Sequence, residues 1–295
     1  MNYNKMLGDI VSDWDAKYHE YKDAILRLKN EAQAAANSVN PKIAEINSER
    51  IQLRKEIKAL YEFLGFFGDI GKKITPFDYV TEDYITPEIY YPDEQGPRPE
   101  VRSDESTVFM KTMAAIFTPL PITLIKNHKN KNEILQTQRQ FELEKISWEK
   151  QIADCEAEVS FLKTANEIAE MYRNIVVVVK DTIDEKIIPE LSGISSFLYA
   201  DAIKNCVIEG TDPADVQPQS IAVFQNTPYD RHYVFVQNAF DYYTLISAFF
   251  KESVLTKMLN DHEVTQEERD EFEKNIAEIK AKEGKLSDHT TFGGK

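Results

Sequence analysis

Glycine, cysteine and, over most of its length, proline are scarce in this chain, and each scarcity excludes something. The 295 residues include ten glycines and two cysteines. Cys155 and Cys206 are too few for a disulfide framework and lack the spacing of a metal site, so we expect two buried, reduced thiols. Seven of the twelve prolines fall between Pro76 and Pro121. Helix breakers are therefore rare elsewhere, and long helices are expected.

The chain also contains fewer basic residues than acidic ones, 35 against 50. The formal net charge of −15 disfavours a nucleic-acid partner, because phosphate binding requires a basic face. Residues 1–15 contain Lys5, Asp9 and Asp13 and build no apolar core of a signal peptide. No stretch reaches the roughly 18 uncharged residues of a membrane-spanning helix. We therefore expect a cytoplasmic protein, or one released by a signal-independent route.

A coiled-coil pattern occupies residues 1–67, the predicted first arm. Apolar residues recur there at alternating spacings of four and three, which is the seam of a coiled coil. Two successive four-residue steps lie beside Pro41, and a stutter next to a proline predicts a kink or break. The predicted seam comprises Leu7, Val11, Trp14, Tyr18, Tyr21, Ile25, Leu28, Ala32, Ala35, Val39, Ile43, Ile46, Arg50, Leu53, Ile57, Leu60, Leu64 and Phe67.

Residues 132–188 carry a similar pattern and form the predicted second arm. Two arms of similar length are most simply closed as an antiparallel hairpin, although an intermolecular coiled coil would use the same seam. The predicted fold is all-α: an elongated helical bundle built on a long antiparallel coiled-coil hairpin. The second seam comprises Ile134, Phe141, Trp148, Ile152, Cys155, Val159, Leu162, Ala165, Ile168, Tyr172, Ile175, Val179 and Ile183.

Between the arms, residues 68–131 form the predicted tip insertion. Its first part, 74–105, is rich in proline, tyrosine and acids, which rules out a long helix. Its second part, 107–125, is apolar and is followed by lysines, so it either packs in the core or contacts a membrane or partner. The candidate contact residues are Phe109, Met113, Ile116, Phe117, Leu120, Ile122, Leu124, Lys126, Lys129 and Lys131. The candidate hinges are Gly65, Gly68 and Gly71.

Residues 189–284 predict shorter helices that complete the bundle, followed by a flexible tail over 285–295. A break is expected at Pro189, and residues 220–224 allow a short strand. Thr265 and Glu268 have the spacing of a capping box, which predicts the start of the last helix.

Few residues suggest chemistry. The densest cluster is 229–233, which contains an acid, an arginine and a histidine, but adjacent side chains of a helix point apart. A helix start capped by Asp230 explains the cluster better. The chain contains no nucleophile elbow, no dinucleotide fingerprint and no pair of histidines at metal-binding spacing. We therefore expect no catalysis, no cofactor, no metal and no small-molecule substrate.

These observations predict a non-enzymatic helical coiled-coil protein that presents its tip to a protein partner or self-associates through seam and tip. A second hypothesis is membrane activity. Long helices that hide an apolar tongue, over a chain of this length, resemble the architecture of the helical pore-forming toxins. That resemblance implies that residues 107–125 insert into an anionic bilayer, with the flanking lysines at the head groups.

Overall fold

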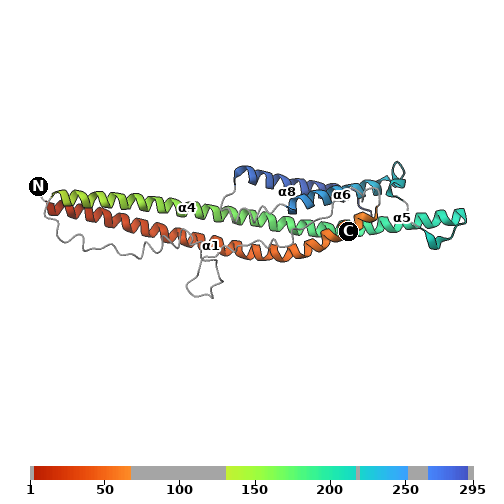
Figure 1. The fold of residues 1–295 in the computed structure, drawn as a ribbon, viewed down its shortest axis with the longest axis horizontal. Helices are drawn as coiled ribbons and strands as arrows, with labels where there is room; N and C mark the ends of the chain where they lie inside the picture. Colours follow the sequence, from red (N-terminus) through yellow and green to blue (C-terminus); the bar gives the residue numbers. More distant parts are fainter. Residues whose placement is uncertain (1–2, 68–130, 217–219, 252–264, 292–295) are drawn as a thin grey trace. The chain divides into compact units, whose positions relative to one another are not determined.

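The regular structure of the described residues is entirely helical. The computed structural model describes residues 3–67, 131–216, 220–251 and 265–291, and it confirms the all-α prediction for these ranges. No helix within them is long and apolar enough to cross a membrane. The helices are α1 (Tyr3–Phe66), α4 (Lys131–Asp181), α5 (Ile188–Glu209), α6 (Asp230–Lys251) and α8 (Gln266–Ser287), with short turns η2 (Thr182–Ile187), η3 (Pro213–Asp215) and η4 (Ile221–Phe224) (Figure 1).

The chain divides into two compact units. The first contains Met1–Asn40 and Ile89–Glu167, and the second contains Pro41–Glu88 and Ile168–Lys295. The boundary on α1 falls at Pro41, where the sequence predicted a kink or break, but the helix itself continues through the proline to Phe66.

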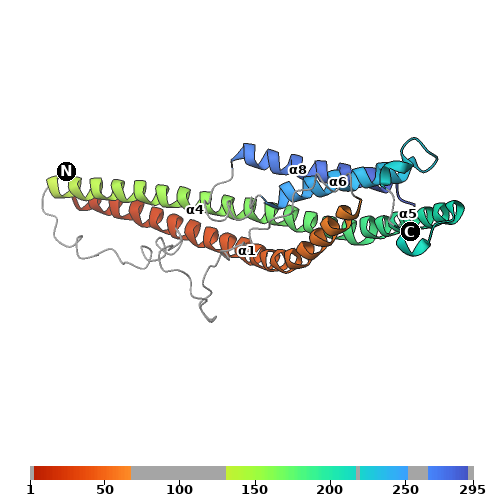
Figure 2. The same ribbon diagram turned by 45° about the vertical axis from the view of Figure 1, so that its right-hand side comes forward.

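In the first unit, α1 and α4 lie side by side and run in the same direction. Tyr21 donates a hydrogen bond to Gln151, and Lys163 forms an ion pair with Glu31, so the partner residue on α4 comes 130 and 132 positions later. A constant offset of this kind defines parallel helices, because in an antiparallel pair the offset falls steadily along the helices. The colours of α1 and α4 advance together in Figures 1 and 2.

The second unit has the same order. Lys180 contacts Glu49 at an offset of 131 residues. The predicted antiparallel direction is therefore wrong in both units. The prediction that 68–131 is the tip of a hairpin rested on that direction and loses its basis. Residues 68–130 lie outside the described residues.

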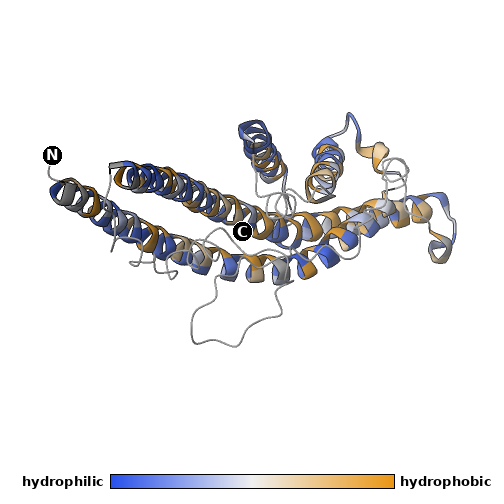
Figure 3. Ribbon diagram, turned by 60° about the vertical axis from the view of Figure 1, so that its left-hand side comes forward, coloured by the Kyte–Doolittle hydropathy of each residue, from blue (hydrophilic) through white to orange (hydrophobic). Residues whose placement is uncertain are grey.

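Burial along the two helices follows the predicted seams closely. The seam residues of α1 are buried from Tyr21 to Phe67, except that Ala36 is buried instead of Ala35. Those of α4 are buried from Cys155 onward, although the seam residue Tyr172 packs against α6 and α8. Trp14 and Trp148 are half-buried. Hydrophilic and hydrophobic colours alternate along both ribbons in Figure 3, as expected for helices with an apolar stripe.

Pro189 also leaves the helical path unbroken, contrary to the predicted break. It lies in the first turn of α5, where the missing amide hydrogen of proline is tolerated. The preceding turn, η2, is a π-helix in which the N–H of Ile188 bonds to the carbonyl of Ile183 five residues earlier.

The helices α6 and α8 pack together and against α4 in the second unit. Phe249 stacks on Phe272 with 5.6 Å between ring centroids, and Tyr172 of α4 stacks on both rings. Lys282 contacts Asp241 at 2.8 Å. Because the later residue of α6 meets the earlier residue of α8, these two helices are antiparallel.

Of the predictions made for residues 220–295 from short sequence motifs, one is confirmed and others are wrong. The capping box is confirmed, since Glu268 N–H donates to the Thr265 hydroxyl and the Glu268 carboxylate accepts the N–H of Thr265. Residues 221–224 form a 3-10 turn and not a strand. Helix α8 continues to Ser287, and Leu286 is fully buried, so the first residues of the predicted tail belong to the helix.

Parallel order can be tested with the native thiol of Cys155. Ile25 belongs to the same buried cluster and lies 130 positions before it, at the offset of the observed contacts. We expect Ile25→Cys to form a disulfide with Cys155 on mild oxidation, detected by mass spectrometry of linked peptides. Ile43→Cys is the matched control, since an antiparallel hairpin about the middle of 68–131 would place position 43 opposite Cys155. A link from position 43 and none from position 25 would contradict parallel packing.

Candidate interaction surfaces

Most of the predicted contact residues fall outside the described part of the chain. Residues 109–129 and the hinges Gly68 and Gly71 are not described, and Lys131 is the first residue of α4. Gly65 lies in the last turn of α1, is exposed, and would tolerate a side chain because nothing lies within 4 Å of an added Cβ. Its role as a hinge stays a prediction.

Polar contacts follow the margins of the helix pair in the first unit. Lys145 binds Asp13, and the indole N–H of Trp14 donates to Glu144 at 2.8 Å. The hydrogen bond from Lys145 lowers the pKa of Asp13, and the bond from Lys163 lowers that of Glu31. Such exposed pairs contribute little stability individually, because water and salt screen them. Their geometry, however, fits only one register of α1 against α4.

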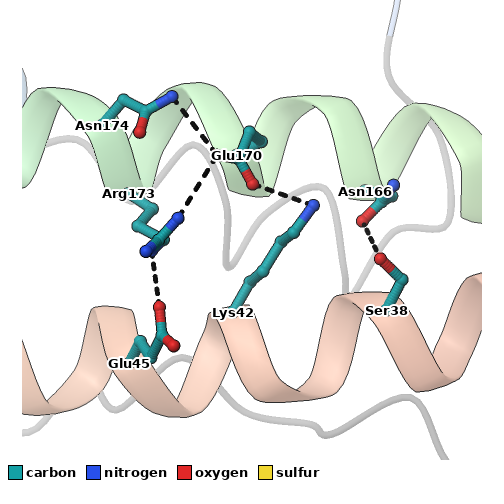
Figure 4. A network of polar contacts seen from close by, with 7 residues as sticks. All are labelled: Ser38, Lys42, Glu45, Asn166, Glu170, Arg173 and Asn174. Carbon is teal, nitrogen blue, oxygen red and sulfur yellow. Dashed lines mark hydrogen bonds and ion pairs between the residues drawn. The ribbon is translucent and has the colours of Figure 1, made fainter.

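The second unit continues this pattern (Figure 4). The Lys42 ammonium lies 2.9 Å from the Glu170 carboxylate, and its hydrogen bond is the main cause that lowers the pKa of Glu170. Arg173 bridges Glu170 and Glu45, at 3.3 and 2.5 Å. The carboxylate of Glu170 therefore binds cations from both helices, which fixes their relative position.

An aromatic layer joins the two helices within the first unit. Trp14 and Trp148 face each other across the pair with 5.6 Å between ring centroids. Tyr21 stacks on Trp148 at 5.4 Å, and Tyr18 stacks on Trp14 at 5.3 Å. Burial raises the pKa of Tyr21 to about 12. These rings fill the space between the helices and so stabilise their contact.

Two shallow depressions lie along the first unit. One, of about 210 Å³, is lined by residues that include Asp9, Asp13 and Lys145, and the other, of about 420 Å³, by residues that include Glu31 and Lys163. Both are open and edged by the ion pairs described above. Pockets for small molecules are usually enclosed and mostly apolar, so neither depression has the character of such a site.

A buried polar cluster in the second unit connects three distant segments. Glu190, in the first turn of α5, is fully buried and accepts the backbone N–H of Thr291 at 2.7 Å. His232, in the first turn of α6, is 2% exposed and lies among the rings of Phe197 and Phe224. Sequence analysis did not identify Glu190, because nothing in its neighbourhood marks it as buried. The cluster ties the chain near its C-terminus to α5.

The charged and aromatic cluster at 229–233 lies at the start of α6, where neighbouring side chains point in different directions. Helix α6 begins at Asp230, as predicted, although the carboxylate accepts the N–H of Asn226 in the preceding turn and not one within the helix. Arg231 is exposed whereas His232 is buried, so the two side chains point apart. They do not form a common site.

Neither a metal-ligand cluster in the described ranges nor a similar known protein assigns chemistry to these residues. Within the described ranges, no three side chains of His, Cys, Asp or Glu are placed to hold a metal ion. No family model matches the chain, and no curated protein and no solved structure matches it.

The buried imidazole of His232 predicts acid sensitivity of the second unit. Burial, aided by the charge of Arg231, lowers its pKa below the value of about 6.5 found in unfolded chains, and Glu190 opposes the shift. The unfolded chain therefore binds a proton first as the pH falls. The free energy of unfolding should decrease from about pH 7 until the folded-state pKa is passed, and should then level off.

We expect His232→Phe to remove this decrease, measured by denaturant unfolding followed by circular dichroism between about pH 7 and pH 5. His19→Gln is the control, because His19 is exposed on α1 and lies outside the second unit. Equal slopes in wild type and His232→Phe would contradict the prediction.

Proposed function

We propose that this chain is a non-enzymatic assembly protein, in which α1 and α4 form an intramolecular parallel coiled coil and residues 68–131 are presented to a protein partner. The observation that most supports it is the pairing of two long helices through one apolar seam with ion pairs at its margins. Such a pair is stiff and holds whatever is attached to it at a fixed place.

The attached segment has the composition of a recognition element. Residues 68–130 are far longer than a usual connection between helices, which has about 2–8 residues. Tyr79, Tyr84, Tyr90 and Tyr91 occur there among acids and prolines. Tyrosine is enriched at the centres of protein interfaces because it combines a large apolar ring with a polar tip.

Site-specific photo-cross-linking tests this proposal. A photoreactive phenylalanine analogue placed at Tyr84 or Tyr90 should capture a protein from the native host extract, and one at Lys58, exposed on α1, should not. Double substitution Tyr84→Ala/Tyr90→Ala should weaken capture of that protein about tenfold or more, since interface tyrosines often contribute over 1 kcal/mol. Equal capture from all positions, or none from 84 and 90, would contradict the proposal.

A second candidate function, membrane activity, is supported by the composition of 107–125 and its flanking lysines. Flotation with phosphatidylserine-containing liposomes distinguishes the two. The assembly proposal expects wild type and Phe117→Asp to remain unbound. Binding by wild type that is lost in Phe117→Asp would favour the membrane function instead.

A further inference from the structure

One side of the last part of α5 is apolar and exposed. Tyr199 is 39% exposed, Ile203 44% and Val207 65%. At 100° per residue, these three side chains, the exposed Ala200 and the half-buried Cys206 lie within an arc of about 120°. We call these five residues the α5 face. No charged residue of α5 falls within this arc.

The opposite side of α5 is already packed within the second unit. Rotated by about 100–180° from Ile203, that side is buried at Leu191, Ile194, Leu198 and Ala202. A helix with apolar residues on two opposite sides requires two neighbours. Within the described ranges, no element covers the exposed side chains of the α5 face.

The chain leaves α1 beside the α5 face. The rings of Phe66 and Tyr199 lie 5.8 Å apart between centroids, so α1 ends next to the first residue of the face. The offset of 131 residues between contacting residues of the two helices places Phe67 opposite Leu198. Helix α5 continues for about three turns past that point (Figures 1 and 2). The residues that follow Phe67 therefore start where the uncovered face starts.

These residues have the composition and the length to cover the face. Residues 70–80 include two isoleucines, a phenylalanine, a tyrosine and a valine. From Tyr199 to Val207 the face is about 12 Å long, at 1.5 Å per helical residue. About four residues of extended chain span that length. Residues 70–80 are therefore long enough to follow the whole face.

Residues 252–264 cannot reach the α5 face. They connect α6 to α8, and both of these helices meet α4 at Tyr172 through stacked aromatic rings. Ile203 lies about 45 Å further along α4 and α5. Because both ends of the connection are fixed, a path out and back through 252–264 extends about 25 Å at most.

The shorter stretches of the second unit do not fit the face either. Residues 217–219 are Gln-Pro-Gln and carry no large apolar side chain. Residues 292–295 extend about 14 Å at most beyond Thr291, which is bound to Glu190, whereas Val207 lies about 25 Å along α5 from Glu190. In the second unit, the stretch that follows α1 combines the required reach with the required composition.

We propose that residues 70–80 of the same chain dock on the α5 face and cover Ile203 and Val207. The proposal rests on the assembly function proposed above, because it defines the fixed base from which Tyr84 and the residues after it are presented. Docking restricts the start of the presented segment. A segment ordered in advance loses less entropy when a partner binds it.

Hydrogen exchange followed by mass spectrometry tests this docking. Peptides from 70–80 should exchange at least about tenfold more slowly in wild type than in Ile203→Asp, because the segment would have to bury a carboxylate in the variant. The matched control is Ile208→Asp, at a position that is 71% exposed and rotated by about 140° from Ile203, which should leave this exchange unchanged. Unchanged exchange in α6 verifies that each variant is folded. Equal exchange of 70–80 in wild type and Ile203→Asp, or equal acceleration in both variants, would overturn the proposal.

The native thiol of Cys206, which belongs to the α5 face, tests the identity of the occupant. Of the separate variants Ile74→Cys and Phe77→Cys, at least one should form a disulfide with Cys206 of the same chain on mild oxidation, detected by mass spectrometry of linked peptides. Adding Ile203→Asp should remove the link, and adding Ile208→Asp should preserve it. No link from either position, or a link only between two copies on a non-reducing gel, would overturn the proposal.

The two proposals can fail separately. A chain that captures a protein through Tyr84 while 70–80 exchanges without protection would overturn the docking and leave the presentation standing. A chain with 70–80 protected that captures nothing through Tyr84 or Tyr90 would do the reverse. A photoreactive residue at Ile203 that captures a separate protein would assign the α5 face to that partner and would overturn the docking.

Discussion

Burial of an apolar stripe of α1 against an apolar stripe of α4 is the contact on which the other features of both units depend. Each fully buried leucine or isoleucine contributes about 1.5–3 kcal/mol, several times the worth of an exposed ion pair. The stripe therefore provides the stability, and the ion pairs at its margins select one register and one direction. Glu170, which binds Lys42 and Arg173, does this in the second unit.

The sequence predicted which residues are buried far better than which way the helices run. Spacings of four and three read the same in both directions, so the pattern of Tyr21, Ile25 and Leu28 cannot distinguish parallel from antiparallel packing. The antiparallel hairpin was predicted because it is the simplest way to connect two arms of similar length. The pairs of opposite charge indicate the direction of the helices. Glu31 pairs with Lys163 and Glu49 with Lys180, and the two pairs have nearly the same separation in sequence, as parallel helices require.

Local chemistry was predictable where the interacting groups are neighbours in sequence. The capping box of Thr265 and Glu268 follows from a spacing of three residues, and Gly210 ends α5 in a left-handed conformation, with φ 71°, that favours glycine. Glu190 was not predictable, because its partner Thr291 lies 101 residues away and meets it only through packing. The contact residues proposed within 107–125 remain predictions from composition.

The position of the tryptophans has a spectroscopic consequence. The chain contains two, Trp14 and Trp148, and both belong to the first unit, where their rings lie 5.6 Å apart across α1 and α4. Light absorbed selectively by indole therefore excites the first unit alone. Its emission reports whether these two helices are together or apart, and the second unit is invisible to it. The chain thus carries an intrinsic optical label on one unit, with no need for an attached dye.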